Sequence, residues 1–158
     1  MRYKVAPPAR SLSFLADARA AIPLVPDDEA DCCRAIQRTT DVPDRETARE
    51  YLTFLRALGL LEESDRGYYR TRTDLERDTL AATFRENVFG AAEVLDVLGT
   101  DPRTADDAFE AVRDIVPRWE RERRANWESV WRTRVEHLLA WAAVFGAARH
   151  TDAGFEAP

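Results

Sequence analysis

The sequence predicts a mainly α-helical protein with two small β-hairpins, built as a tandem repeat of one small unit. Two observations lead to this prediction. Apolar residues recur at steps of three and four along most of the chain, which is typical of amphipathic helices. Gly59 and Gly146 each follow such a helix, and in both cases a second glycine comes eight residues later within a polar turn. The 158 residues, 45% of them hydrophobic, suffice for one ordinary domain or two very small ones.

The first unit is expected over residues 11–72, after an irregular arm formed by residues 1–10. Ser11 can accept a hydrogen bond at the start of a short helix. Pro23 ends that helix, because a residue that precedes proline disfavours the α conformation. A second helix is expected to open at residues 26–28.

The third helix of this unit is expected over residues 45–58. Asp44 is a suitable N-cap residue, and Gly59 ends the helix as its C′ residue. Next come Leu60-Leu61, a polar stretch at residues 62–67 and Tyr68-Tyr69-Arg70, an order that predicts a β-hairpin. The expected inward-facing side chains of the helix are Ala48, Tyr51, Leu52 and Leu55.

The second half of the chain is predicted to repeat the first, at a spacing of 87 residues. The matched pairs are Phe54 with Trp141, Leu58 with Phe145, Gly59 with Gly146, Ser64 with Thr151, Asp65 with Asp152, Gly67 with Gly154, and Tyr68 with Phe155. A helix-ending glycine and a turn glycine in one unbroken register indicate duplication of a whole unit. Residues 118–124 have no counterpart in the first half.

Upstream of the matched region, the two halves differ. Thr73 and Glu76 have the spacing of a capping box, which predicts one long helix to about Leu98. We therefore expect a long connecting helix and turn over residues 73–103, as part of the second domain. The second unit itself is expected over residues 104–158.

Three helices followed by a hairpin are the element order of the winged helix-turn-helix superfamily, and the chain resembles a tandem form of it. The resemblance rests on the run Thr47-Ala48-Arg49-Glu50-Tyr51-Leu52, then Leu55, Leu58, Gly59 and Leu60. It implies that the helix at residues 45–58 is the recognition helix and that the hairpin at residues 60–70 is the wing.

The composition adds to this resemblance. The net charge is −6, Lys4 is the sole lysine among 23 basic residues, and there are three isoleucines. This composition resembles that of proteins from a GC-rich, salt-adapted microbe such as a haloarchaeon, and GC-rich coding in an ordinary bacterium is the alternative. Together with the winged-helix motifs, the chain thus resembles haloarchaeal transcriptional regulators of the tandem-repeat form. In molar salt the Debye length is about 3 Å, so acidity there serves solvation and says little about partners.

The resemblance implies that DNA is contacted by the exposed flank of the third helix and by the wing. The expected DNA-binding residues are Arg45, Arg49, Thr53 and Arg56 on the helix, with Arg66, Tyr69 and Arg70 on the wing. Arginine forks suit guanine edges and phosphates. A solvated, non-functional face is the alternative, because Glu46 and Glu50 adjoin the flank and Glu62-Glu63 precede the wing tip.

The second unit carries a row of large aromatic residues and a weaker basic face. Trp127, Trp131, Trp141 and Phe145 are expected to be mostly buried, inside the chain or across a dimer seam. The second unit is therefore expected to serve packing or dimerisation, and a homodimer is a possible partner state.

Two functions of different class follow. The first is a DNA-binding transcriptional regulator whose partner is double-stranded DNA. The alternative is a protein–protein interaction scaffold, since tandem winged helices resemble subunits of condensin-type and membrane-remodelling complexes.

An enzyme is not expected, because the sequence has no Gly-rich phosphate loop, HExxH or GxSxG motif. Cys32 and Cys33 are expected to pack as small hydrophobes, and His137 as a partly buried structural imidazole. No cofactor or metal is expected. No apolar run has the roughly 18 residues of a membrane helix, so we expect a cytoplasmic protein without a membrane partner.

Overall fold

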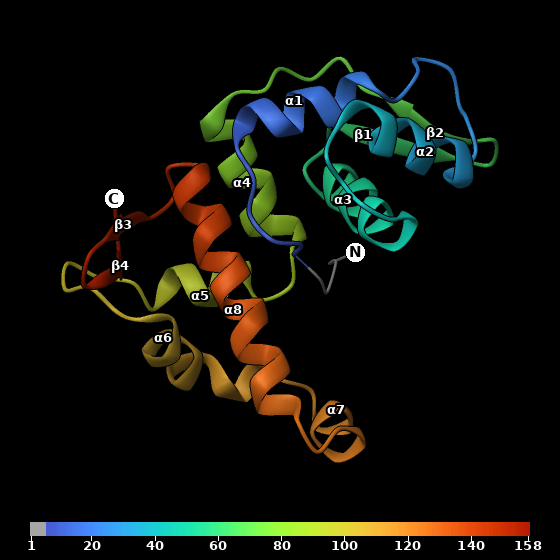
Figure 1. Cartoon of the computed structure of the whole chain (residues 1–158). Coiled ribbons are helices and arrows are strands. Elements are labelled where there is room, and N and C mark those ends of the chain that lie inside the picture. The colour runs from blue at the N-terminus through green and yellow to red at the C-terminus, as the bar shows by residue number, and fades with distance from the viewer. Residues whose placement is uncertain (1–5) are drawn as a thin grey trace.

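The computed structural model describes residues 6–158, which are mainly helical with two antiparallel two-stranded sheets (Figure 1). This confirms the predicted fold class. Of the expected arm at residues 1–10, residues 6–10 form no helix or strand, and residues 1–5 lie outside the described part of the chain.

The first unit contains the three helices and the hairpin predicted for it. These elements are α1 (Leu12–Ala20), α2 (Glu29–Thr39), α3 (Arg45–Ala57), β1 (Leu61–Ser64) and β2 (Gly67–Arg70). The predicted caps are confirmed, because the side chains of Ser11 and Asp44 each accept a hydrogen bond from the backbone N–H three residues later, at 3.1 and 2.7 Å. Asp28 caps α2 in the same way, at 2.7 Å.

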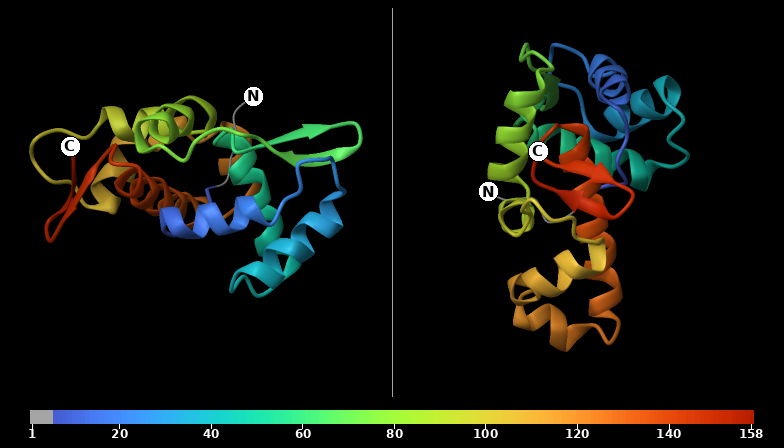
Figure 2. Two further views of the ribbon diagram at one scale, coloured as in Figure 1. Left: turned by 90° about the horizontal axis from the view of Figure 1, so that it is seen from above. Right: turned by 90° about the vertical axis from the view of Figure 1, so that its left-hand side faces the viewer.

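The second unit has the same order with one helix added. Its elements are α5 (Ala91–Asp96), α6 (Ala105–Val112), a 3-10 turn (Arg113–Ile115), α7 (Arg118–Arg123), α8 (Trp127–Val144), β3 (Arg149–Thr151) and β4 (Gly154–Glu156). The two hairpins lie at opposite ends of the molecule (Figure 2). In Figure 1, α8 runs through the middle of the molecule.

Backbone geometry repeats at the predicted spacing of 87 residues. Gly59 and Gly146 end α3 and α8 with φ of 79° and 74°. Gly67 and Gly154 begin the second strand of each hairpin with φ of 123° and 134°. These are left-handed values that favour glycine, so the same turn chemistry builds both hairpins.

Each hairpin also pairs with the loop before the second helix of its unit. The backbones of Tyr68 and Asp27 exchange two hydrogen bonds, of 2.8 and 2.9 Å, and those of Phe155 and Arg103 do the same at 2.7 and 2.8 Å. Asp27 and Arg103 are 76 residues apart, whereas the hairpins are 87 apart. Of the eleven extra residues of the second unit, five lengthen α8, which has 18 residues against 13 in α3, and the other six lie before α8, where α7 is found.

The long helix predicted from residue 73 to residue 98 is wrong, because two helices occupy this stretch. α4 (Arg77–Asn87) ends where Val88 turns extended, and α5 begins after Gly90, which has φ of 86°. Glu76 precedes α4 without a side-chain cap bond, so the expected capping box does not form. The break lets α5 occupy the place that α1 has in the first unit, since their last residues are also 76 apart. The domain boundaries at residues 72 and 103 stay a prediction.

The two units share one aromatic core. Phe54 of α3 lies against Trp141 of α8, with ring centroids 4.5 Å apart, although these two residues are counterparts in the repeat. Phe84 of α4 contacts Phe54 and Phe145, at 6.4 and 5.4 Å. All four side chains are at most 1% exposed. Packing of α3, α4 and α8 therefore joins the units.

Three of the four aromatic residues assigned to an interface lie inside the chain. Trp131, Trp141 and Phe145 are 2%, 0% and 1% exposed, which leaves no ring surface for a second subunit. Trp127 is partly buried beside Phe109. A dimer seam built on this row stays a prediction for Trp127 alone.

Candidate nucleic-acid interface

The exposed face of α3 carries the four residues assigned to DNA contact on this helix. Ala48, Leu52 and Leu55 are fully buried on its inner side. Arg45 and Arg49 are exposed on the outer side, where Thr53 and Arg56 are partly exposed. The helix periodicity thus brings these four side chains to one face, as α3 packs on α2.

Arg45 and Arg49 form no ion pair with any residue in the described range 6–158. They line a surface hollow of about 350 Å³ together with Glu29 and Glu46. Both guanidinium groups are therefore available to an external acceptor, although two carboxylates stand close by.

Two other assigned residues are already engaged by carboxylates of the first hairpin. Arg56 forms an ion pair with Glu63, at 2.7 Å between Nη1 and Oε1. The hydroxyl of Tyr69 donates to Glu62, also at 2.7 Å, and this bond raises the pKa of Tyr69. The ion pair connects α3 to the hairpin, so the two elements present one continuous surface.

The remaining two assigned residues lie at different places on the hairpin. Arg66 is exposed at the tip, beside Gly67. Arg70 stands opposite the buried Leu61 in the strand register, and its Nη1 lies 3.5 Å from the carbonyl of Ala20 at the end of α1. The structure therefore joins α3 and the outer hairpin, and it places Arg70 apart, beside α1.

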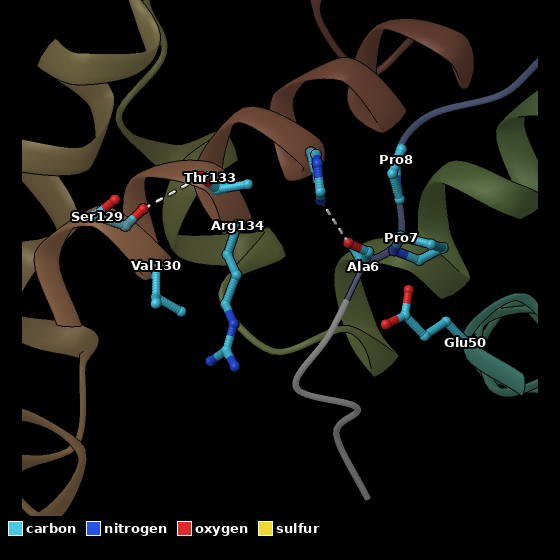
Figure 3. Close-up of a pocket in the computed structure, with 9 residues that line it drawn as sticks. Ala6, Pro7, Pro8, Glu50, Ser129, Val130, Thr133 and Arg134 are labelled. Carbon is cyan, nitrogen blue, oxygen red and sulfur yellow. Dashed lines mark hydrogen bonds between the residues drawn. The ribbon is translucent and has the colours of Figure 1, made fainter. Parts of the chain in front are cut away.

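No sequence pattern indicates that the arm before α1 binds α3 and α8. Three consecutive carbonyls of the arm each meet a side chain of these helices. Tyr51 of α3 donates to Pro8 at 2.7 Å, and Trp141 of α8 donates to Pro7 at 2.6 Å. His137 Nδ1 lies 2.9 Å from the carbonyl of Ala6 (Figure 3). Since a carbonyl only accepts, Nδ1 is the donor. The arm thus fixes α3 against α8.

A pocket of about 330 Å³ lies beside residues 6–8 of the arm (Figure 3). Glu50 of α3 borders it on one side, and Arg134 of α8 on the other. Burial raises the pKa of the Glu50 carboxyl and lowers that of the Arg134 guanidinium. Arg134 is held near Glu120, at 3.6 Å, and over the ring of Trp131. These contacts assign Arg134 to the internal structure of the second unit.

The corresponding face of α8 differs in charge from that of α3. At a spacing of 87 residues, the counterparts of Arg45, Arg49, Thr53 and Arg56 are Arg132, Glu136, Ala140 and Ala143. Arg132 forms ion pairs with Asp106 and Glu110, at 3.4 and 3.1 Å. The second unit therefore presents no basic face equivalent to that of α3.

The two cysteines and one cluster of carboxylates have structural roles. Cys32 and Cys33 are fully buried, as predicted, and burial raises the pKa of Cys32 to about 12, so its thiol stays protonated. Within residues 6–158, one group of carboxylates has metal-like spacing: Asp27, Asp28 and Asp31. They flank the start of α2, where Asp28 serves as the cap. No helix in the described part of the chain has the length and apolarity to span a membrane.

Comparison with known protein families identifies the family of this chain. The family model described as "Halobacterial double winged helix domain" matches residues 1–158. No curated protein and no solved structure matches the chain. The matched family agrees with the two helix–helix–helix–hairpin units and with the repeat of their backbone geometry. The chain therefore belongs to the halobacterial double winged helix domain family.

Proposed function

We propose that this protein is a DNA-binding transcriptional regulator that reads duplex DNA with α3 and the first hairpin. The observation that carries the proposal is that Arg45 and Arg49 are exposed on the second helix of a helix-turn-helix and form no ion pair with residues 6–158. Membership of a winged-helix family supports a regulator of this kind. The residues proposed to contact DNA are Arg45, Arg49, Thr53, Arg56, Arg66, Tyr69 and Arg70.

In this proposal, α3 lies in the major groove. Arg49 is central on the exposed face, so it is the residue proposed to donate two hydrogen bonds to guanine O6 and N7. Arg45 is at the first turn of α3, where it reaches the phosphate backbone at the groove edge. Arg66 at the hairpin tip contacts the neighbouring backbone or minor groove.

The carboxylates of the first hairpin oppose DNA binding in this proposal. Glu62 and Glu63 hold Tyr69 and Arg56 in the free protein, and both repel phosphate. Binding must exchange the Arg56–Glu63 ion pair for a contact to DNA. Weak, sequence-independent attraction is thereby reduced, and close hydrogen bonding carries more of the affinity.

The second unit is proposed to position the first and to support a homodimer. Two copies of α3 would then read two half-sites about one helical turn apart, roughly 34–36 Å. Trp119 of α7 is half-exposed and Trp127 is partly exposed, so both side chains present surface for such contact.

The test is selection from a pool of random duplexes with the full chain, followed by sequencing. A regulator enriches one motif, and a dimer enriches a palindromic one. Enrichment of no motif would refute the proposal.

A protein–protein scaffold is the second candidate, favoured by the acidic hairpin residues Glu62, Glu63 and Asp65. In that case the chain is not retained on heparin at any point of a salt gradient.

A further inference from the structure

Three arginines line one surface hollow on a part of the first unit that the helix α3 does not reach. The hollow has a volume of about 380 Å³ and lies between the end of α1 and the segment that follows β2. The residues that line it include the charged or hydroxyl-bearing Arg19, Arg70, Arg72, Thr73 and Asp74. We call it the Arg19 pocket.

Within residues 6–158, no carboxylate forms an ion pair with the arginines of the Arg19 pocket. None of the three arginines lies within 4.0 Å of a carboxylate oxygen of the described residues, and this includes Asp74, which lines the same pocket. Elsewhere in the same range, most helices carry at least one paired arginine. In a chain with 29 acidic residues and a net charge of −6, three unpaired arginines around one hollow are a local reversal of charge.

Backbone carbonyls fix two of the three guanidinium groups in place. Arg19 donates from Nη1 to the carbonyl of Thr73, and Nη1 of Arg70 lies 3.5 Å from the carbonyl of Ala20. Each guanidinium carries five N–H donors, so one backbone bond orients the group and leaves the other donors free. Arg72 is exposed at the rim and has no such bond among the described residues. Two of the three guanidinium groups are therefore oriented before any ligand binds.

We infer that the Arg19 pocket binds a phosphate group. Planar guanidinium forks match the tetrahedral oxygens of phosphate, and its negative charge, one in a DNA phosphodiester and up to two in a free phosphate, compensates part of the positive charge. The hydroxyl of Thr73 at the same wall supplies a further polar partner. The phosphate belongs either to a free small molecule or to the backbone of bound DNA, and the second source rests on the proposed function.

Calorimetric titration of the full chain with inorganic phosphate, at constant ionic strength, tests the pocket. The variants are Arg70→Ala and Arg72→Ala, and the matched control is Arg123→Ala, an exposed arginine on the distant α7. Loss of one charge-assisted contact is expected to weaken phosphate binding about tenfold in each pocket variant and to leave the control unchanged. Circular dichroism of each variant verifies that it is folded.

A second titration uses a duplex that the wild type enriches. If DNA supplies the phosphate, Arg72→Ala weakens duplex binding and inorganic phosphate competes with the duplex. If a free molecule supplies it, Arg72→Ala weakens phosphate binding alone. Phosphate binding that persists when no duplex binds would support the pocket while refuting the regulator. The inference is overturned if the folded wild type shows no saturable phosphate binding, or if Arg70→Ala and Arg72→Ala bind phosphate as well as Arg123→Ala does.

Discussion

Removal of the Trp141 side chain is expected to be the most damaging single truncation in this protein. The indole is fully buried, stacks at 5.5 Å on Phe145 and lies 4.5 Å from Phe54 of the other unit. Truncation of such a ring costs about 3–5 kcal/mol. The carbonyl of Pro7, which accepts from Nε1 at 2.6 Å, also loses its partner, at about 1 kcal/mol.

Trp141→Ala should therefore lower the free energy of unfolding by about 4–6 kcal/mol. For a chain of this size each kcal/mol corresponds to about 2–4 °C in Tm, so the midpoint should fall by roughly 10–20 °C. The assay is thermal and denaturant unfolding at one fixed salt concentration, followed by circular dichroism.

Two matched variants separate the contributions. Trp141→Phe keeps an aromatic ring and removes the donor, so about 1–3 kcal/mol should be lost. Trp127→Ala removes an indole that is partly exposed between Arg113 and Arg121, so it should cost less than Trp141→Ala. If Trp141→Ala and Trp127→Ala lower Tm equally, the junction between the units is not the core described above.

Three further predictions concern the turns, the thiols and the hairpin charges. Gly67→Ala and Gly154→Ala should each destabilise by more than about 1 kcal/mol in unfolding assays, because an added Cβ would lie 2.0 or 2.2 Å from a backbone oxygen; wild-type stability in either variant would contradict the repeated turn geometry. Cys32 should resist iodoacetamide at pH 8 until the chain unfolds, and rapid alkylation of the folded protein would refute its burial. The free energy of unfolding should decline as pH rises from about 9 toward 12, because the thiol ionises first in the unfolded chain and has a pKa of about 12 in the folded one. Glu63→Gln should raise duplex affinity about two- to tenfold by removing a carboxylate that pairs with Arg56 and repels phosphate, and an unchanged affinity would show that their ion pair does not oppose binding.

Local chemistry explains why much of the fold follows from the sequence. Caps such as Ser11 and Asp44 act over three residues, and left-handed glycines such as Gly59 and Gly146 act at a single residue. Both signals are visible in one sequence. The break before α5 is not visible in the sequence, because Val88 and Gly90 lie in an otherwise helical pattern. Gly90 packs closely against Ile115 and Leu138, which are distant in the sequence, and a Cβ added at Gly90 would lie 3.3 Å from each.

The candidate site was predictable to a similar degree. Helical periodicity places Arg45 and Arg49 on one face without knowledge of the fold. The pairing of Arg56 with Glu63 and the position of Arg70 beside α1 depend on how the hairpin is seated. The contacts of the arm at residues 6–8 cannot be predicted from local sequence, because the donors to its backbone carbonyls lie up to 134 residues away.

The affinity of Arg49→Ala for the enriched duplex, measured for every single-base variant of that duplex, tests the central claim most directly. Arg49 is exposed and makes no described ion pair, so the variant should fold as the wild type does. The account predicts a loss of about 1–3 kcal/mol on the enriched duplex and relaxed preference at one base pair, while Arg66→Ala weakens all duplexes alike. Unchanged affinity and an unchanged base preference in Arg49→Ala would contradict recognition of DNA by α3.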